Sequence, residues 1–253
     1  MRYAIRNTQY AIRNTYYVVR ISYSVFRVEH HVFWDMEITV AGEVVRLLPE
    51  RAMFWPRQRA LFVADLHVGK AAAFRAAGLA VPEGHLADDL SRLSQAIARV
   101  GARQVIFLGD LLHAAQGVTA QVIAQVAAWR RSHAACQFLV VRGNHDRRAG
   151  DPPPEWTMEC ADEPYREGPF VLRHAPGLSD AGYVLAGHLH PAVSLRGRGK
   201  LRARLPCFVV SPRQMILPAF GGFTGAAVIH PGAGERIYAI ADQAVIPIND
   251  GMA

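Results

Sequence analysis

Side chains that can bind a metal ion follow five apolar segments of this sequence, each at the point where the segment ends. The segments are LFVADLH (61–67), VIFLGD (105–110), FLVVRGNHD (138–146), FVLRH (170–174) and YVLAGHLH (183–190). They supply seven potential ligands: Asp65, His67, Asp110, Asn144, His174, His188 and His190. Aspartate oxygen and histidine nitrogen suit Mn²⁺, Fe²⁺ or Zn²⁺. Seven ligands are too many for one ion that also holds water, but they suffice for two ions about 3.5–4 Å apart that share a bridging carboxylate.

The spacing within two of these motifs favours shared ions. In Asp65-x-His67, alternate side chains of an extended turn can reach the same ion. His188-x-His190 has the same spacing and can also divide between two ions. Each motif alone is more often an ordinary turn, and His174 alone would be interpreted as a buried histidine with a hydrogen-bond partner. The joint pattern of suitable residue types after five apolar segments therefore carries the metal hypothesis.

An alternating order of strands and helices must position these side chains. Apolar runs and helical periodicity predict strands at 61–65, 104–110 and 136–146, and helices at 84–101 and 119–132. This order favours parallel pairing, and ligands bind at the carboxyl ends of strands in such sheets. Beyond a loop at 151–156, short strands separated by Pro and Gly predict a second, mostly antiparallel sheet packed on the first. The expected fold class is α/β.

Other residues near these motifs are weaker candidates. Gly109, Gly143 and Gly187 each precede a ligand, where a missing Cβ lets the backbone turn sharply. His113 is close enough to the site in sequence to support it, and Lys70 and Arg75 are candidates to face a phosphate. The segment LPAFGGFTG (217–225) is expected either to lie against the site through its backbone or to form a tight loop between strands.

The composition is that of one globular domain. The chain has 253 residues, of which 51% are apolar, so it can bury a full core. No apolar run approaches the roughly 20 residues that span a bilayer, and the N-terminal region lacks the continuous apolar segment of a signal peptide. Cys136, Cys160 and Cys207 are widely spaced and form no CxxC motif. We therefore expect neither a disulfide framework nor a thiolate zinc site. We expect a cytoplasmic location.

The first 35 residues differ from the rest and predict a boundary at Met36. YAIRNTQ is followed at once by YAIRNTY, and Arg recurs at positions 6, 13, 20 and 27. A coiled coil of this period would favour Leu, Glu and Lys over Tyr, Ile, Val and Thr. A translated tandem DNA repeat upstream of the true start would give such a pattern. We expect residues 1–35 to be a wrongly assigned start or a disordered extension, with a real basic arm as the alternative, and residues 36–253 to form the functional domain.

The net charge of +7 favours a polyanionic partner. The segment LRGRGKLRARL (195–205) contains no acidic residue, and Lys200, Arg202 and Arg204 are predicted contacts to such a partner. Arg142 and Arg147, which flank GNHD, are further candidates. The alternative for each is a solvated position with no substrate contact.

The order of the motifs resembles that of the calcineurin-like metallophosphoesterases over about residues 60–190. That order is Asp-x-His, Gly-Asp, Gly-Asn-His-Asp, a single His and Gly-His-x-His. More narrowly, ADLHVGK, GDLLH, GNHD, GHLHP, PCF and LPAFGGFTG together resemble the ligase-associated DNA damage response endonucleases of the PdeM type, from Met36 to about residue 245. The resemblance implies a four-layer α/β/β/α metallophosphoesterase sandwich and a two-metal phosphodiester hydrolase. It also implies DNA as the substrate and a DNA ligase or helicase as repair partners.

The roles of family residues fall on matching positions of this sequence. By resemblance, one ion is held by Asp65, His67 and His190, the other by Asn144, His174 and His188, and Asp110 bridges them. His145 is implied to protonate the leaving oxygen or to stabilise the transition state, with Asp146 orienting it. Manganese is the implied metal, with iron or zinc as alternatives.

Two other functions stay open. The first is a phosphatase or small-nucleotide phosphodiesterase on the same fold, although the sequence has no long cap segment to enclose a small molecule. The second is a scaffold that kept the fold and lost the chemistry. A scaffold would be expected to have lost ligands, and all seven are present.

Overall fold

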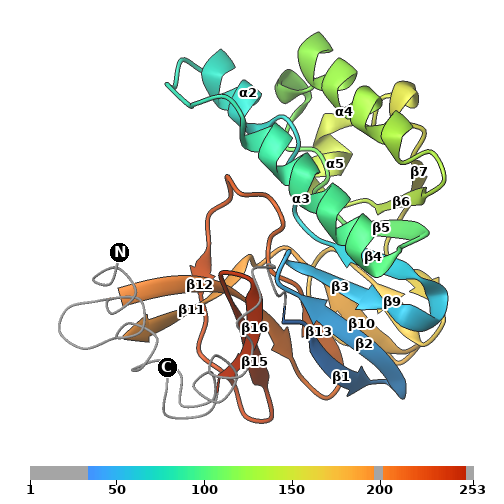
Figure 1. Ribbon diagram of the computed structural model, residues 1–253, viewed down its shortest axis with the longest axis vertical. Coiled ribbons are helices and arrows are strands. Elements are labelled where there is room, and N and C mark those ends of the chain that lie inside the picture. The colour runs from blue at the N-terminus through green and yellow to red at the C-terminus, as the bar shows by residue number, and fades with distance from the viewer. Residues whose placement is uncertain (1–33, 197–201, 249–253) are drawn as a thin grey trace, which may run out of the picture.

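The computed structural model describes residues 34–196 and 202–248 (Figure 1). A first sheet contains seven strands in chain order: β1 (Met36–Val40), β2 (Glu43–Leu48), β3 (Ala52–Trp55), β4 (Ala60–Val63), β5 (Gln104–Leu108), β6 (Gln137–Val141) and β7 (Glu159–Ala161). Strands β1 to β4 pair antiparallel, and β4 to β7 pair parallel. The parallel order predicted from the alternation of strands and helices is confirmed.

The central strands of this sheet are buried on both faces. All four residues of β4 are buried, as are the last four of β5 and of β6. Continuous apolar runs are typical of parallel strands covered on both sides. One face packs on helices and the other on the second sheet, which gives two separate apolar cores.

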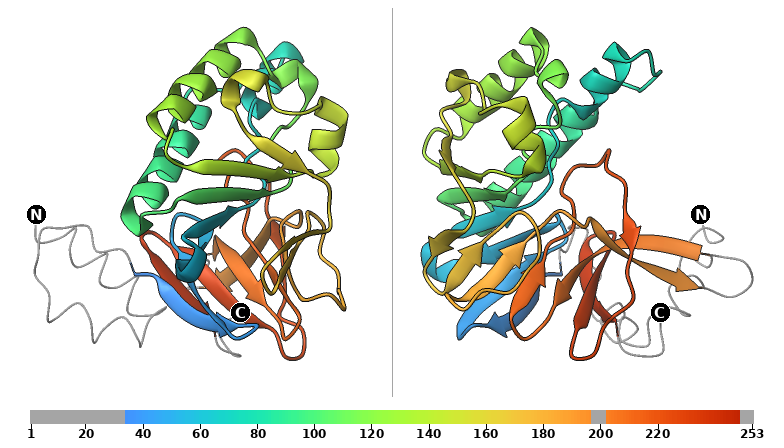
Figure 2. Two further views of the ribbon diagram at one scale, coloured as in Figure 1. Left: turned by 90° about the vertical axis from the view of Figure 1, so that its right-hand side faces the viewer. Right: turned by 180° about the vertical axis from the view of Figure 1, so that it is seen from behind.

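The helices cover the outer face of the first sheet (Figure 2). They are α2 (Lys70–Ala76), α3 (His85–Val100), α4 (Ala120–Ser132) and α5 (Asn144–Ala149), with 3-10 turns η2 (Pro56–Gln58), η3 (Ala115–Gly117) and η4 (Pro154–Trp156). Helix α3 buries Leu90, Leu93 and Ile97 on one side and ends at Gly101, whose φ of 64° suits a residue without a side chain.

The second sheet contains the remaining strands. In spatial order they are β14 (Ala227–Val228), β11 (Pro191–Arg196), β12 (Arg202–Val210), β13 (Gln214–Ile216), β10 (Tyr183–Ala186), β9 (Phe170–Leu172) and β8 (Tyr165–Glu167), and β12 also pairs with β15 (Arg236–Ala241), which pairs with β16 (Ala244–Ile248). Most of these pairings are antiparallel, as predicted, but β10 is parallel to both of its neighbours and β11 is parallel to β14. The α/β two-sheet sandwich is therefore confirmed.

Two details differ from the sequence prediction. The predicted strand at 136–146 ends at Val141, and Asn144 begins helix α5, because the Asp146 carboxylate accepts a hydrogen bond from the Gly143 amide and caps the first turn. In addition, the described residues after η4 form strands and no helix. Of the four expected layers, the described structure thus contains the helical layer on the first sheet and the two sheets.

The packed part of the chain includes two residues before the predicted boundary at Met36. The Trp34 amide donates to the Gln243 carbonyl at 2.9 Å, and the Asp35 carboxylate forms an ion pair with Arg99 at 2.8 Å. Residues 1–33, to which the expectation of an unpacked extension mainly applies, lie outside the described residues. Among the described helices, none is long and apolar enough to cross a membrane.

Candidate metal centre

The carboxyl ends of strands from both sheets meet at one edge of the sandwich. Backbone hydrogen bonds join the ligand-bearing loops to each other: the Asp65 amide donates to Gly109, and the His67 amide donates to Asp110. The His188 amide, from the second sheet, donates to the Asp65 carboxylate at 2.8 Å. All seven predicted ligands are therefore brought to one place, as the strand-end pattern predicted.

Asp65, His67 and His190 form the first donor group. The Nε2 atoms of His67 and His190 lie 3.3 Å apart, and Nε2 of His190 lies 3.5 Å from Oδ1 of Asp65. Oδ1 of Asp65 is fully buried and has no hydrogen-bond partner among the described residues. A buried carboxylate oxygen without a donor is costly unless a cation or a proton meets it.

Asp110, Asn144, His174 and His188 form the second donor group. Nε2 of His174 lies 2.9 Å from Oδ1 of Asn144, 2.9 Å from Nδ1 of His188 and 3.3 Å from Oδ2 of Asp110. Oδ2 of Asp110 also lies 4.0 Å from Nε2 of His67 in the first group. One carboxylate oxygen thus faces both groups, which is the position expected of a bridging ligand.

These separations fit ligands around divalent cations. Donor atoms held roughly 2.1 Å from one ion lie about 3.0 Å apart at a right angle and about 3.4 Å apart at the tetrahedral angle. The distances within the two groups, from 2.9 to 3.5 Å, fall in or next to this range. The mixed oxygen and nitrogen donors, with no thiolate among them, suit Mn²⁺, Fe²⁺ or Zn²⁺.

The electrostatics of the cluster favour positive charge at its centre. Burial opposes a charge on His174, but its hydrogen bond to Asp110 and the nearby Asp65 carboxylate raise the pKa of this imidazole. Burial also opposes ionisation of Asp110, yet hydrogen bonds from His174 and from the His145 amide lower the pKa of its carboxyl. Burial lowers the pKa of His67 to about 3, so this imidazole is neutral near neutral pH, the form that binds metal.

The backbone of the ligands adopts a conformation that side chains rarely favour. Five of the seven have a positive φ: 54° at Asp65, 52° at His67, 50° at Asp110, 71° at His188 and 49° at His190. Such residues cost of order 1–3 kcal/mol each and cluster at functional sites. The concentration of this strain in the candidate ligands supports a functional role independently of their chemistry.

The glycines before the ligands are required chiefly by close packing. A Cβ at Gly109 would overlap the His174 ring, one at Gly143 would overlap the Asp110 carboxylate, and one at Gly187 would lie 2.6 Å from Asp65. Of these three glycines, only Gly109 has a positive φ, of 79°. The predicted need for glycine therefore holds, but at Gly143 and Gly187 its reason is contact rather than a sharp turn.

His145 lies beside both donor groups and belongs to neither. Its Nδ1 donates to the His113 carbonyl at 2.6 Å, and its Nε2 lies 4.0 Å from Oδ2 of Asp110. The His113 ring stacks on it with centroids 4.9 Å apart. Nitrogens of His67, His113 and His145 also lie within 4.8 Å of one another. The bond to His113 directs Nε2 of His145 towards the ligand cluster.

Comparisons with known proteins agree with this geometry. A family model described as calcineurin-like phosphoesterase matches residues 58–188. The chain belongs to the calcineurin-like phosphoesterase family. It is similar to the crystal structure of Pseudomonas putida nuclease MPE, with 40% identity, a TM-score of 0.75, and coverage of 85% of this chain and 100% of that chain. The E. coli phosphoesterase Yfce is 16% identical, with a TM-score of 0.36 and coverage of 74% and 96%. No curated protein matched the chain.

As a calcineurin-like phosphoesterase, the protein is a hydrolase that depends on divalent metal ions. The two donor groups are the candidates to hold these ions. The alternative of a scaffold that lost the chemistry is not supported, because all seven candidate ligand residues are present and converge.

Asp146 does not have the predicted role in this phosphoesterase. Its buried carboxylate accepts hydrogen bonds from the amides of Leu112, Gly143 and Leu111 at 2.7, 2.9 and 3.3 Å. The imidazole of His145 is oriented by the His113 carbonyl instead. Asp146 therefore connects the loop after β5 to the start of α5, next to Asp110 and Asn144, and does not contact the imidazole of His145.

The predicted substrate contacts Arg142 and Arg147 are engaged within the protein. Arg142 forms a bidentate ion pair with Asp151 at 2.7 and 2.8 Å, which raises its pKa. Arg147 lies 3.7 Å from Glu163, and the other oxygen of Glu163 accepts from the His174 amide at 2.7 Å. The contact with Glu163 favours a role for Arg147 in holding the loop that carries His174.

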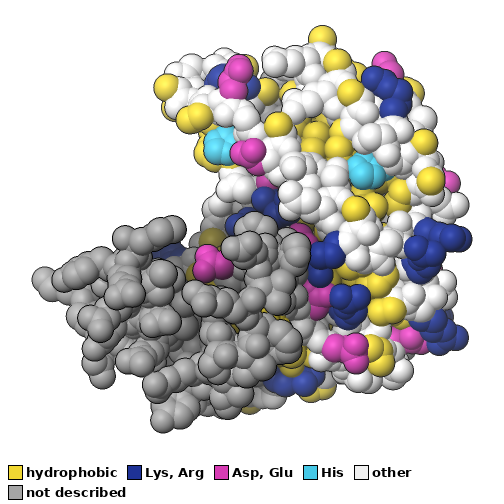
Figure 3. Space-filling view, viewed as in Figure 1, with side chains coloured by type: hydrophobic (Ala, Val, Ile, Leu, Met, Phe, Trp, Pro, Cys, Tyr) yellow, Lys and Arg dark blue, Asp and Glu magenta, His cyan; other side chains and the backbone are white. Residues whose placement is uncertain are grey.

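Arg204, the predicted basic contact whose side chain the structure describes, lies away from the ligand cluster. Arg204 is exposed on β12 and pairs with Ser194, which is four residues after His190 and so about 13 Å along an extended strand. Lys200 lies outside the described residues, and the side chain of Arg202 is not described. On the face in Figure 3, Lys and Arg side chains are interspersed with acidic ones. Contacts from Arg204 would reach a polynucleotide only beyond the reacting phosphate.

The role of the 217–225 loop was open from the sequence. The structure places its backbone against the site: the Phe220 and Gly221 amides donate to Ala64 and Asp65, and the Gly225 carbonyl accepts from Nδ1 of His190. The buried Asp89 of α3 accepts from the Gly222 amide at 2.8 Å. No local sequence pattern would have paired Asp89 with a loop more than 130 residues away.

Proposed function

We propose that this phosphoesterase is a two-metal phosphodiesterase that acts as an endonuclease on DNA. The observation that carries the proposal is the pair of donor groups that share Asp110, in a chain 40% identical to a nuclease along that nuclease's whole length. The proposal assigns Asp65, His67 and His190 to one ion, Asn144, His174 and His188 to the other, and Asp110 to both.

Two divalent ions at such a site supply an activated water and positive charge against the phosphoryl oxygens. We propose Mn²⁺ as the working ion, with Fe²⁺ and Zn²⁺ as the alternatives that reconstitution separates. The protein supplies a buried, preformed set of donors and keeps His67 neutral for binding. Asp110, held by the His145 amide at 2.9 Å, fixes the two halves of the donor set relative to each other.

His145 is proposed as the general acid. Because its Nδ1 donates to the His113 carbonyl, the second proton of the imidazolium lies on Nε2, which faces the cluster. A carbonyl acceptor also stabilises the positive charge that the imidazolium carries before transfer. Nε2 can then give its proton to the sugar oxygen as the phosphorus–oxygen bond breaks, leaving a neutral imidazole.

The proposal extends to the cellular context. The described cysteines Cys136, Cys160 and Cys207 are all unpaired, which is consistent with a reducing cytoplasm. The sequence resemblance to ligase-associated endonucleases supports action in DNA repair beside a ligase or helicase.

Metal reconstitution tests the proposal. Metal-free protein would be loaded with Mn²⁺, Fe²⁺ or Zn²⁺ and assayed on circular single-stranded DNA, duplex DNA, an aryl phosphodiester and an aryl phosphomonoester. Cleavage of the circle, which has no ends, is expected and would establish endonuclease activity. Hydrolysis of the monoester alone would instead support a phosphatase.

Asp110→Asn tests the bridging assignment within the same experiment. The expected result is loss of hydrolysis and a metal content of one ion or fewer per chain by mass spectrometry. Asp151→Asn, at an exposed acid outside the donor groups, is the matched control. Full metal occupancy in Asp110→Asn protein would contradict the bridging role.

A further inference from the structure

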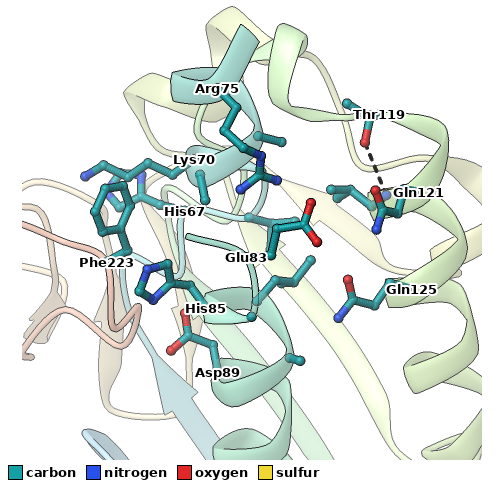
Figure 4. A pocket seen from close by; sticks show the side chains of 18 of the residues that line it. His67, Lys70, Arg75, Glu83, His85, Asp89, Thr119, Gln121, Gln125 and Phe223 are labelled. Atoms are coloured by element: carbon teal, nitrogen blue, oxygen red, sulfur yellow. Dashed lines mark hydrogen bonds between the residues drawn. The ribbon is translucent and has the colours of Figure 1, made fainter. Parts of the chain in front are cut away.

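A pocket opens beside the first donor group, between helices α2, α3 and α4 (Figure 4). Its volume is about 230 Å³, and its lining includes His67 at one end. Pockets for drug-sized ligands have roughly 300–1,000 Å³. This pocket is therefore large enough for one ring system and too small for a dinucleotide.

One wall of the pocket is aromatic. Phe223, from the 217–225 loop, stacks on the imidazole of His85 at the start of α3, with centroids 5.0 Å apart and planes 16° apart. The ammonium of Lys70 lies 5.8 Å from the Phe223 ring centre and 5.9 Å from that of Phe74. Figure 4 shows Phe223, His85 and Lys70 gathered on the side nearest His67.

The opposite wall carries carboxamides. Gln121 and Gln125 of α4 lie across the pocket from Phe223 (Figure 4). Among the described residues, neither side chain makes a hydrogen bond, whereas Thr119 beside them accepts from the Val122 amide as the helix cap. An amide side chain can both donate and accept, and so can match the edge of a nucleobase.

The charged groups at the pocket do not form a phosphate site. Arg75 is directed to the carbonyls of Val81 and Pro82 at 3.3 and 3.4 Å, and the ammonium of Lys70 lies over the Phe74 and Phe223 rings. The acids Glu83 and Asp89 also line the pocket. An aromatic wall opposed by unpaired amides suits a planar heteroaromatic group better than an isolated anion.

We propose that this pocket binds the nucleobase of a nucleotide next to the scissile phosphate. The inference rests on the proposed nuclease function, since it identifies the part of a polynucleotide that lies beside the metal centre. Because His67 belongs to both the pocket and the first donor group, the base and the reacting phosphate belong to neighbouring positions of one strand. A base that enters the pocket must leave its stack. It stacks on Phe223, displaces the Lys70 ammonium from that ring and pairs its edge with Gln121 or Gln125.

Binding of a fluorescent base tests the pocket without hydrolysis. Oligonucleotides with 2-aminopurine at successive positions would be titrated with the metal-free full chain. Quenching is expected at one position of the bound strand, and Phe223→Ala is expected to weaken binding about 5- to 150-fold, the equivalent of about 1–3 kcal/mol. Phe223→Tyr, which keeps the ring, is expected to bind as tightly as the unchanged protein. Quenching that is equal at all positions would overturn the proposal.

Cleavage by the Mn²⁺-loaded enzyme provides the second arm. An abasic site scanned along an oligonucleotide is expected to reduce cleavage when it lies at one fixed distance from the cut, and Gln125→Ala is expected to reduce cleavage of intact DNA more than Gln137→Ala. Gln137 is an exposed glutamine at the first position of β6, the end of that strand away from the candidate metal centre. Competition by inorganic phosphate without any abasic effect would show an anion pocket and refute a base site. Position-specific quenching without cleavage in any metal would refute the proposed nuclease instead.

Discussion

Replacement of Asp146 by Asn tests the revised role of this residue. The carboxylate is buried and accepts three backbone hydrogen bonds, one through Oδ1 and two through Oδ2. An amide can place its single oxygen at the Oδ2 position and keep the bonds from Gly143 and Leu111. Its NH₂ group then faces the Leu112 amide. The Leu112 N–H and the new NH₂ group are therefore two buried donors without an acceptor.

The expected cost follows from that count. A buried polar group left without a partner costs about 1–3 kcal/mol, so two such groups cost about 2–6 kcal/mol. Burial raises the pKa of Asp146, which means that removing the negative charge recovers part of this cost. We therefore expect a loss of about 2–4 kcal/mol in the free energy of unfolding. For a domain of this size the melting temperature falls by about 2–4 °C per kcal/mol, or about 5–15 °C in total.

The assay is thermal and denaturant unfolding of metal-free protein, so that metal binding does not contribute. Asp151→Asn is the matched control, because Asp151 is an exposed acid whose ion pair with Arg142 is worth at most about 1 kcal/mol. Activity of Asp146→Asn on DNA and on an aryl diester should fall in equal proportion, since Asp110 and Asn144 are displaced for both. An unchanged melting temperature, or a loss confined to DNA, would refute the role in joining the two loops and restore Asp146 as the partner of His145.

Two other predictions concern His145 and the start of the packed chain. His145→Ala should keep both metals and lose about 10²–10⁴-fold on DNA, but much less on an activated aryl diester whose leaving group needs no proton. Parallel kinetics and metal analysis check this, and equal losses on both substrates would place His145 on the phosphorus instead. A chain starting at Met36 should melt at least about 2–4 °C below one starting at Trp34, because it lacks the ion pair of Asp35 with Arg99, worth about 1 kcal/mol, and the backbone hydrogen bonds of Trp34 with Gln243 and Val245. Identical melting curves would show that these contacts contribute nothing.

The convergence of the candidate ligands could be predicted from sequence because their signal is local. Each follows an apolar strand, and parallel strands bring their carboxyl ends to one edge, so residue type and strand order together determine the meeting point. The partners of those ligands could not be predicted in this way. Asp146 follows His145 directly, and only the path of the loop after β5 decides that its carboxylate meets three amides rather than the imidazole.

Long-range partners account for the rest of what the sequence left open. Glu163 holds the His174 amide and Gly225 accepts from His190, although neither residue belongs to a metal-binding pattern. The carbonyl that orients His145 belongs to His113, and any residue at that position would offer the same carbonyl. The residue type therefore does not predict which backbone carbonyl accepts the bond. The contacts that orient the site are thus largely invisible to motif analysis.

The strained ligands can persist only because the surrounding backbone holds them. Five positive φ angles at about 1–3 kcal/mol each represent roughly 5–15 kcal/mol, comparable to the whole stability of a typical domain. The loops that carry these residues are joined by hydrogen bonds between main chains, from His67 to Asp110 at 2.9 Å and from Val68 to Leu111 at 2.7 Å. The second sheet adds the bond from the His188 amide to the Asp65 carboxylate. Because these bonds involve only protein atoms, the donor geometry is built by the packing of the two sheets. Metal binding at the proposed site would therefore need little rearrangement of the chain, and substitutions that separate the two sheets should weaken it even where no candidate ligand is changed.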